Sequence, residues 1–364
     1  MVDRPPQNGV RARDAGVDSG GQTFTATTPT KLSCNLGPDG GVCACADQPL
    51  LGDPPNLYFV LDRSASMQED SKWRTIVTVL GTLVVDLGPR ANVGAAVFPD
   101  PQYNSCAPGV EVAALRRGDS PAGTAGPTAT ALLTELGALS ANGGTPTAAT
   151  LEAIGPRLAK LPGKTFVILA TDGGPNCNAT AACDVDLCEL NIENVAAACE
   201  ASGPHNCCAD PNYGSDLSCL DAQPTIDAVT AIAQSGVPVY VVGVPGSAPY
   251  ASLLDALAKA GGTARSTEPL YYAVDTTDVS AFTAAIFSIA ATITGTCTLA
   301  LDDVPPEPTN VNVFLGETVL PQAGPDGWTL SGKTVTILGQ SCDAIRTGAV
   351  LDVRVVAGCP TLER

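Results

Sequence analysis

The sequence predicts an α/β protein whose core is a doubly wound, mostly parallel sheet of the Rossmann-like type. Strand-like apolar runs alternate with helical segments between residues 56 and 294, which is typical of a parallel sheet with helices on both faces. Two of these runs end in an aspartate, Asp62 and Asp172. A cluster of cysteines and a series of short strands separated by Pro and Gly add a disulfide-rich insertion and a small C-terminal antiparallel β domain.

Each element of the central unit follows from a local pattern. The apolar and aromatic run that ends at Asp62 predicts a buried strand. Residues 72–87 carry apolar side chains at helical spacing: Trp73, Ile76, Val77, Leu80, Leu83, Val84 and Leu87. The same reasoning predicts strands at 92–98, 110–115, 164–171, 237–243 and 271–274, and helices at 128–139, 147–161, 226–235, 250–260 and 279–294. We expect the strand at 110–115 to return as the hairpin partner of 92–98.

These patterns divide the chain into four parts. Residues 1–31 are polar and predict a flexible tether, and residues 32–55 form a Cys-containing N-terminal segment. Residues 56–294 form the central α/β domain, interrupted at 177–222 by the Cys-rich insertion, in which a helical piece is expected near 191–200. Residues 295–364 form the small β domain, with strands predicted at 298–301, 311–315, 333–338 and 350–356.

Charge excludes two classes of partner. The net charge is −18, whereas binding to nucleic acid needs clustered Lys and Arg, and so does docking on an anionic lipid surface. The plain interpretation of the charge is solubility. No apolar stretch is long enough to predict a transmembrane segment.

The fourteen cysteines, beside a single histidine, predict disulfides and an oxidising compartment. The tight pairs Cys43–Cys45 and Cys207–Cys208 lack the spacing of structural zinc sites. All fourteen are therefore disulfide candidates: Cys34, Cys43, Cys45, Cys106, Cys177, Cys183, Cys188, Cys199, Cys207, Cys208, Cys219, Cys297, Cys342 and Cys359. We expect an extracellular, cell-surface or periplasmic protein. Because no signal peptide follows Met1 and no lipobox is visible, we also expect that the natural chain begins upstream.

The insertion predicts one disulfide to a distant loop. It holds seven cysteines, so one of them needs a partner outside it. Cys106 is the candidate, because it follows the strand at 92–98, which is expected to end on the same rim of the sheet as Asp62. The other six cysteines then belong to the opposite end of the molecule, where their pairing is not deducible from spacing.

Oxygen-bearing side chains gather at the predicted strand ends. Asp62-x-Ser64-x-Ser66 follows the first strand, Thr145 lies in Gly-Gly-Thr-Pro-Thr, and Asp172 follows the strand at 164–171. Carboxylates and hydroxyls suit a hard divalent cation such as Mg²⁺, with Ca²⁺ and Mn²⁺ as alternatives. Thr147 is an alternative to Thr145, and helix capping by the Asp-x-Ser-x-Ser turn is the bland alternative to a metal site.

Taken in order, Asp-x-Ser-x-Ser, Gly-Gly-Thr-Pro and Thr-Asp-Gly-Gly resemble the metal-ion-dependent adhesion site (MIDAS) of a von Willebrand factor type A (VWA) domain. The resemblance covers about residues 56–294, with Ala65 where many members have Gly, and it leaves the Cys-rich insertion unexplained. It implies that the two serines and the threonine face the ion, and that the aspartates act directly or through water. It also implies that a carboxylate from a protein partner completes the coordination. The implied function is metal-dependent protein binding or adhesion in a bacterial cell-surface protein, not catalysis. Because a cation accepts any accessible carboxylate, we expect the Cys-rich insertion to set partner choice, with a purely stabilising role for the insertion as the alternative.

The same sequence allows functions of other classes. A recruiting subunit of an enzyme or secretion assembly is the main alternative, and free thiols would favour it. A Ser-His-Asp hydrolase would have to use His205, which lies in the Cys-rich insertion. No phosphate-binding glycine motif with Lys-Ser/Thr is present. Asp302, Asp303 and Glu307 are interpreted as a solvated acidic turn in preference to a calcium site.

Overall fold

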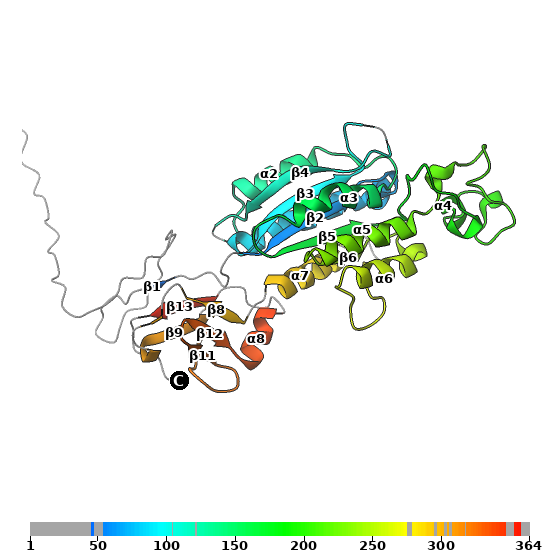
Figure 1. Ribbon diagram of the computed structural model, residues 1–364. Coiled ribbons are helices and arrows are strands. Elements are labelled where there is room, and N and C mark those ends of the chain that lie inside the picture. Colours follow the sequence, from blue (N-terminus) through cyan, green and yellow to red (C-terminus); the bar gives the residue numbers. More distant parts are fainter. Residues whose placement is uncertain are drawn as a thin grey trace, which may run out of the picture.

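The computed structural model describes residues 45–46, 54–103, 105–120, 122–274, 279–294, 297–301, 304–305, 308–316, 318–346 and 353–357. A six-stranded sheet of order β4-β3-β2-β5-β6-β7 forms the centre of the molecule (Figure 1). Its parallel strands are β2 (Asn56–Asp62), β3 (Asn92–Phe98), β5 (Thr165–Thr171), β6 (Val239–Gly243) and β7 (Tyr272–Ala273). The edge strand β4 (Val110–Arg117) runs antiparallel to β3, as the hairpin prediction required.

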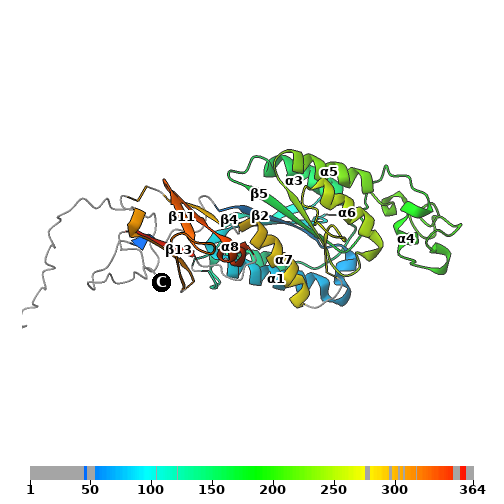
Figure 2. The same ribbon diagram turned by 90° about the horizontal axis from the view of Figure 1, so that it is seen from below.

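Helices cover both faces of this sheet, so the predicted doubly wound architecture is confirmed. One face carries α1 (Lys72–Leu87), α2 (Pro127–Gly137) and α7 (Val279–Thr294), and the other carries α3 (Thr147–Leu158), α5 (Ala222–Gln234) and α6 (Ala251–Ala260). Figure 2 shows α1 and α7 on the side opposite α3, α5 and α6. The two buried clusters divide β2 by its alternation, with Leu57, Phe59 and Leu61 in one and Tyr58 and Val60 in the other.

The segment between β5 and α5, which we call the cap (residues 177–221), is built from short pieces. These are η3 (Val185–Leu187), α4 (Glu189–Ile192), η4 (Ala197–Cys199) and η5 (Asp216–Ser218). The single helical piece expected near 191–200 is instead two short ones, α4 and η4, because Asn194 takes a left-handed φ of 54° between them. The fully buried Asn191 instead holds the irregular chain, donating to the carbonyls of Glu200 (3.0 Å) and His205 (2.8 Å).

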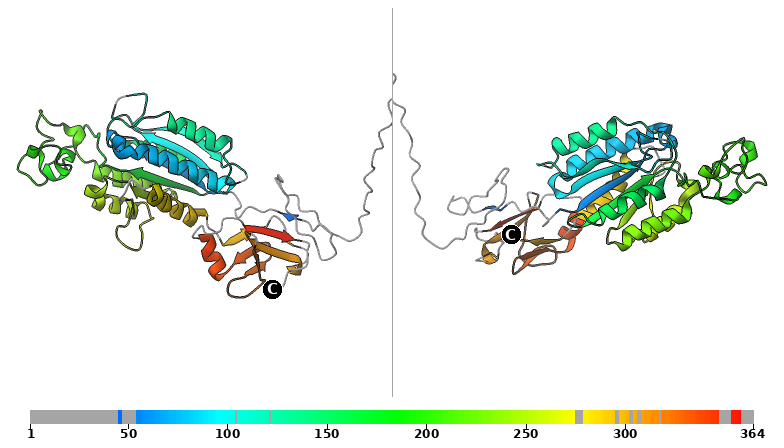
Figure 3. Two further views of the ribbon diagram at one scale, coloured as in Figure 1. Left: turned by 180° about the vertical axis from the view of Figure 1, so that it is seen from behind. Right: turned by 45° about the horizontal axis from the view of Figure 1, so that its top comes forward.

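The cap and the C-terminal β region lie at opposite ends of the central sheet (Figure 3). The cap follows the carboxyl end of β5, so it extends from the edge of the sheet at which Asp62 and Asp172 lie. Among the described helices, none combines the length and apolar character that a membrane crossing needs.

The C-terminal region contains two small antiparallel sheets, β1-β13-β9-β10 and β11-β12-β8. Their strands are β1 (Cys45–Ala46), β8 (Thr298–Ala300), β9 (Val311–Leu315), β10 (Thr318–Leu320), β11 (Trp328–Ser331), β12 (Thr334–Ile337) and β13 (Val353–Ala357). A helix that the sequence analysis did not predict, α8 (Gly339–Arg346), adds to this region. Pairing of β1 with β13 brings part of the N-terminal segment to the β region.

The remaining helical turns are of the 3₁₀ type. They are η1 (Ala65–Ser71), η2 (Gly88–Arg90), η6 (Ala248–Tyr250) and η7 (Pro308–Asn310). Of these, η1 contains Ser66 and leads directly into α1, so it joins the predicted site to a buried helix.

Candidate metal centre

The parallel pairing of β2 with β5 brings two predicted ligands to one edge of the sheet. The register pairs Leu61 with Ala170, so Asp62 and the Thr171-Asp172 pair end neighbouring strands. Backbone hydrogen bonds fasten the loop after α2 to the turn after β2: Ala65 N donates to Gly143 O (2.8 Å), and Asn142 N donates to Arg63 O (2.6 Å). Gly143 has a φ of 94°, which an L-residue rarely adopts.

Four of the predicted ligands form a continuous chain of contacts. Asp62 Oδ1 accepts a hydrogen bond from Ser64 N (2.8 Å). Ser64 Oγ lies 3.1 Å from Ser66 Oγ, and Ser66 Oγ donates to Asp172 Oδ1 (2.8 Å). Ser64 is the N-cap residue of η1, yet its side chain makes no capping hydrogen bond. The turn's polar groups therefore point to one another, which the helix-capping alternative does not explain.

Thr145 approaches the same point from the loop before α3. A Cβ atom built on Gly173 would lie 3.9 Å from both Ser66 Oγ and Thr145 Oγ1, so these two hydroxyls flank one glycine. Thr147, the alternative, has its hydroxyl 3.4 Å from the backbone oxygen of Thr145. The structure thus gathers Asp62, Ser64, Ser66, Thr145 and Asp172, and it uses Thr147 within the loop.

Burial makes this cluster costly without a cation. Asp62 is 0% exposed and Asp172 is 3% exposed. Burial, followed by the negative charge of Asp172, raises the pKa of Asp62 well above its ordinary value. Two neighbouring buried carboxylates with hydroxyl oxygens beside them fit a hard divalent cation, which would supply the missing positive charge.

Two contacts of these ligands lay outside the sequence prediction. Lys72 Nζ lies 2.7 Å from Asp172 Oδ2 and 3.6 Å from Glu69 Oε2, and the lysine is buried. Thr171 Oγ1 donates to Asp62 Oδ2 (2.5 Å). Thr171 belongs to the Thr-Asp-Gly-Gly motif and was open to prediction, whereas nothing in the spacing of Lys72 distinguishes it from a surface lysine.

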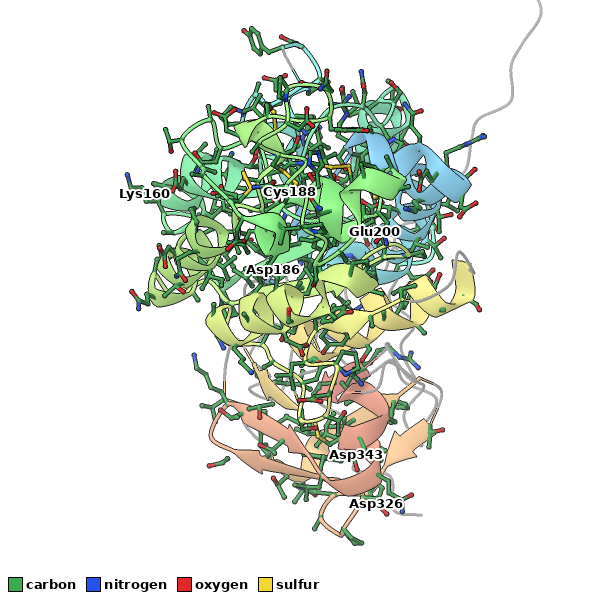
Figure 4. All side chains as sticks on the ribbon, turned by 90° about the vertical axis from the view of Figure 1, so that its right-hand side faces the viewer. Lys160, Asp186, Cys188, Glu200, Asp326 and Asp343 are labelled. Atoms are coloured by element: carbon green, nitrogen blue, oxygen red, sulfur yellow. A yellow bond between two sulfur atoms is a disulfide. The ribbon has the colours of Figure 1, made fainter. Side chains whose placement is uncertain are left out.

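The cap reaches the site through Asn176. Asn176 Oδ1 accepts from Thr145 N (2.7 Å), and Asn176 Nδ2 donates to Glu189 Oε2 at the start of α4. Burial is the main cause that raises the pKa of Glu189 to about 8, and repulsion by Glu193, Asp62 and Asp172 adds to the rise. Figure 4 views the molecule from the cap end, with Asp186, Cys188 and Glu200 of the cap in front of the central sheet.

The structure pairs every cysteine whose side chain it describes. One disulfide, Cys106–Cys177, joins the loop after β3 to the base of the cap. The others are Cys183–Cys219, Cys188–Cys208, Cys199–Cys207 and Cys297–Cys342. Cys183, Cys208 and Cys219 have neighbouring sulfurs because they belong to adjacent disulfides, which leaves no thiolate to bind a metal. The pairing expected for Cys34, Cys43 and Cys359, and for the Cys45 side chain, lies outside the described residues.

The hydrolase alternative gains no support from His205. Its Nε2 lies 2.9 Å from Asp210 Oδ2, and its ring meets Tyr213 edge-on. In the described part of the chain, no serine hydroxyl is hydrogen-bonded to this histidine. Asp302, Asp303 and Glu307 lie outside the described residues.

Comparison with known proteins gives structural likenesses only. No family model matches the chain, and no curated protein matches it. It is similar to the pilus adhesin SpaC from Lactobacillus rhamnosus GG, with 17% identity and a TM-score of 0.48 over 86% of this chain. The match spans 40% of SpaC, so this chain corresponds to less than half of that adhesin.

Two further similar structures carry the VWA name. The vWF domain of the type V pili tip protein Mfa5 from Porphyromonas gingivalis is 15% identical, with a TM-score of 0.42 over 67% of this chain and 97% of that one. A von Willebrand factor type A protein from Catenulispora acidiphila is 14% identical, with a TM-score of 0.42 over 85% of this chain and 59% of that one. In its strand order and its two helical layers, the central unit of this chain has a VWA-like fold.

Proposed function

We propose that this protein is a cell-surface binding module that uses a divalent cation to engage a protein partner. Asp62, Ser64, Ser66, Thr145 and Asp172 would hold the ion. The observation that carries the proposal is the contact chain from Asp62 through the two serines to Asp172 at the carboxyl edge of the sheet, in which both aspartates are buried. Ligands bind at this edge in open α/β sheets.

The donor set favours Mg²⁺. Mg²⁺ prefers six oxygen ligands and keeps several waters, so two carboxylates and a few hydroxyls suffice. When bound, the ion would supply an electrophilic centre for a carboxylate oxygen of the partner. Neighbouring side chains hold the two aspartates in place: Thr171 orients Asp62, and Lys72 together with Ser66 orients Asp172.

A surface location agrees with the cysteine chemistry. The described disulfides are stable in an oxidising compartment and rare in the cytoplasm. They therefore favour an extracellular or cell-surface module over a cytoplasmic recruiting subunit. An adhesive role is also the one named for SpaC.

The cap is the part suited to choose the partner, because a cation by itself accepts any accessible carboxylate. Four exposed apolar side chains lie on it: Leu187, Val195, Tyr213 and Leu217. Residues 177–221 also contain eight Asp and Glu and no Lys or Arg. This composition fits a partner that surrounds its carboxylate with apolar and basic groups. A cap that merely stabilises a long loop is the alternative.

The test combines capture with removal of the cap. The immobilised protein is exposed to envelope fractions of the source organism, with and without chelator, beside D62A. We expect one set of partners that is lost with chelator and in D62A. Capture that is indifferent to both would contradict metal-dependent binding.

The cap's share is separated by replacing residues 178–218 with a short linker. The linker can be short because Cys177 N donates to Leu217 O (2.9 Å), so the two ends of the cap are adjacent. Cys219→Ser accompanies the change, since its partner Cys183 leaves with the cap. We expect metal binding to persist at reduced affinity, because the contact of Glu189 with Asn176 leaves with the cap, and we expect partner binding to be lost. Retention of the same partner would make the cap structural.

A further inference from the structure

One carboxylate of the cap lies close to the candidate metal centre. Glu189 opens α4, directly after Cys188, which is fully buried and bonded to Cys208. The backbone of Cys188 also forms a β-bridge with Cys219. Glu189 is therefore held by cross-linked chain on the side that faces the domain.

Asn176 connects this carboxylate to the loop that carries Thr145. The amide accepts from Thr145 N (2.7 Å) through Oδ1 and donates to Glu189 through Nδ2. Asn176 N in turn donates to Thr145 O (2.9 Å). A single amide side chain thus separates Glu189 from a predicted ligand loop. The charges of Glu193, Asp62 and Asp172 all act on Glu189, so these four carboxylates share one electrostatic environment.

Charge balance gives Glu189 a role beyond fastening the cap. Among the neighbouring charges, buried Arg63 is balanced by buried Asp100, while Glu69 and Glu193 are exposed to solvent. The remaining buried charges, those of Asp62, Asp172 and Lys72, then sum to −1 without Glu189, and a divalent cation would bring them to +1. An uncompensated buried charge is unfavourable, and one further carboxylate brings the sum to zero. The part of the cap that the structure describes offers several acidic residues but only Glu189 bonded to Asn176.

We propose that Glu189 supplies, from within the chain, the carboxylate that completes the ion's coordination in the free protein. The cap then holds the site closed, and a partner's carboxylate must displace Glu189 to bind. This inference rests on the proposed metal site. The alternative is that Glu189 only links the cap to Asn176 and does not contact the ion.

The test uses Mn²⁺ as the probe, because the relaxation of water protons reports how many waters remain on a bound Mn²⁺. Affinity and hydration are measured for the full chain and for E189Q, E189D and D62A. Glutamine still accepts from Asn176, so E189Q preserves the cap contact, and E189D preserves the charge while shortening the side chain. E193Q is the matched control, since Glu193 follows the same helix, is exposed and bonds Tyr250 Oη (2.9 Å).

We expect E189Q to bind Mn²⁺ about tenfold more weakly or worse. The Mn²⁺ ion bound to E189Q or to E189D should carry about one more water than in the unmodified protein. In E193Q the number of bound waters should equal that of the unmodified protein. Unchanged hydration in E189Q, with or without a loss of affinity, would overturn the inference. If D62A binds as tightly as the unmodified protein, the metal site itself is wrong; loss of binding in D62A alone leaves that site standing and rejects only the role of Glu189.

Discussion

At the scale of single residues, the buried lysine is the feature of the site that its sequence motifs do not announce. Lys72 Nζ lies 2.7 Å from Asp172 Oδ2, and both side chains are almost fully buried. In the metal-free protein the ammonium compensates the charge of Asp172. When a cation binds, the same ammonium repels it, so Lys72 stabilises the empty site at the expense of metal affinity.

Replacing Lys72 with Met should therefore change stability and affinity in opposite directions. Removing one partner of a buried ion pair should lower the free energy of unfolding of the metal-free protein by about 3 kcal/mol. Mg²⁺ affinity should rise about tenfold or more. Denaturant unfolding with and without Mg²⁺ measures both, and Lys160→Met, on an exposed lysine, is the control. Weaker Mg²⁺ binding in Lys72→Met would mean that the positioning of Asp172 by the ammonium outweighs its repulsion of the ion.

At the scale of elements, a disulfide clamps the loop that carries Thr145. A Cβ atom at Gly144 would lie 2.5 Å from Cys177 Sγ and 3.4 Å from Cys106 Sγ, so the glycine packs directly on the bond. Gly144 N also donates to Ser105 O (2.8 Å). The Cys106–Cys177 bond thus joins the loop after β3, the Thr145 loop and the base of the cap.

The double variant C106S/C177S should lose metal affinity as well as stability. The bond spans 71 residues, and loss of such a link typically costs about 2–4 kcal/mol. Freeing the Thr145 loop should weaken Mg²⁺ binding about tenfold. C297S/C342S removes a disulfide that spans 45 residues in the C-terminal region, and it should lower stability while leaving Mg²⁺ affinity unchanged. Equal Mg²⁺ affinities in the two double variants would show that the Cys106–Cys177 bond does not contribute to metal binding.

The first turn of helix α2, which packs on α1 beside the sheet, is stabilised by a carboxylate that precedes the helix in the sequence. Asp119 accepts from the backbone N–H groups of Gly126 (3.1 Å), Thr128 (2.9 Å) and Ala129 (2.8 Å). Burial alone would raise the pKa of Asp119, but these backbone hydrogen bonds outweigh it and lower the pKa. The carboxylate is thus better stabilised in the folded chain than in the unfolded one.

Asp119→Ala should lower the free energy of unfolding at pH 7 by about 1–2 kcal/mol. A depressed folded pKa contributes stability above the ordinary Asp range, and this stability is lost as the pH falls through the folded value. The gap between the variant and the unmodified protein should therefore shrink below about pH 4. Unfolding at pH 7 and pH 3 measures it, with Asp119→Asn as the variant that keeps an acceptor oxygen. A gap of the same size at both pH values would contradict stabilisation of this helix end by the charged form of Asp119.

At the scale of the whole molecule, the sequence predicts the elements that local patterns determine and misses those that depend on contacts between separate parts of the chain. The helix at 72–87 and the strand at 92–98 match α1 and β3 because apolar periodicity is local. Cap geometry and α8 were missed because distant partners determine them: Asn191 is satisfied by residues 9–16 positions away, and α8 begins where Gln340 N donates to Asp326 Oδ1 (2.7 Å).

The residues of the candidate site fall into the same two groups, those that the sequence predicts and those that it does not. Asp62, Ser64 and Ser66 belong to one turn, and parallel pairing of buried strands places Asp172 beside them. Lys72, Asn176 and Glu189 have no local pattern that distinguishes them, since their roles come from contacts made after folding. The ion itself stays a prediction.

The most direct test of the metal site is a calorimetric titration of Mg²⁺ into the full chain and into D62A, each first freed of metal by chelator. We expect one site per chain in the unmodified protein. We expect no measurable heat in D62A, since Asp62 is buried at the centre of the cluster and contacts both the Ser64 turn and Thr171. Far-ultraviolet circular dichroism of D62A should match the unmodified protein, which shows that the fold is kept. An unchanged Mg²⁺ affinity in a folded D62A would contradict the account.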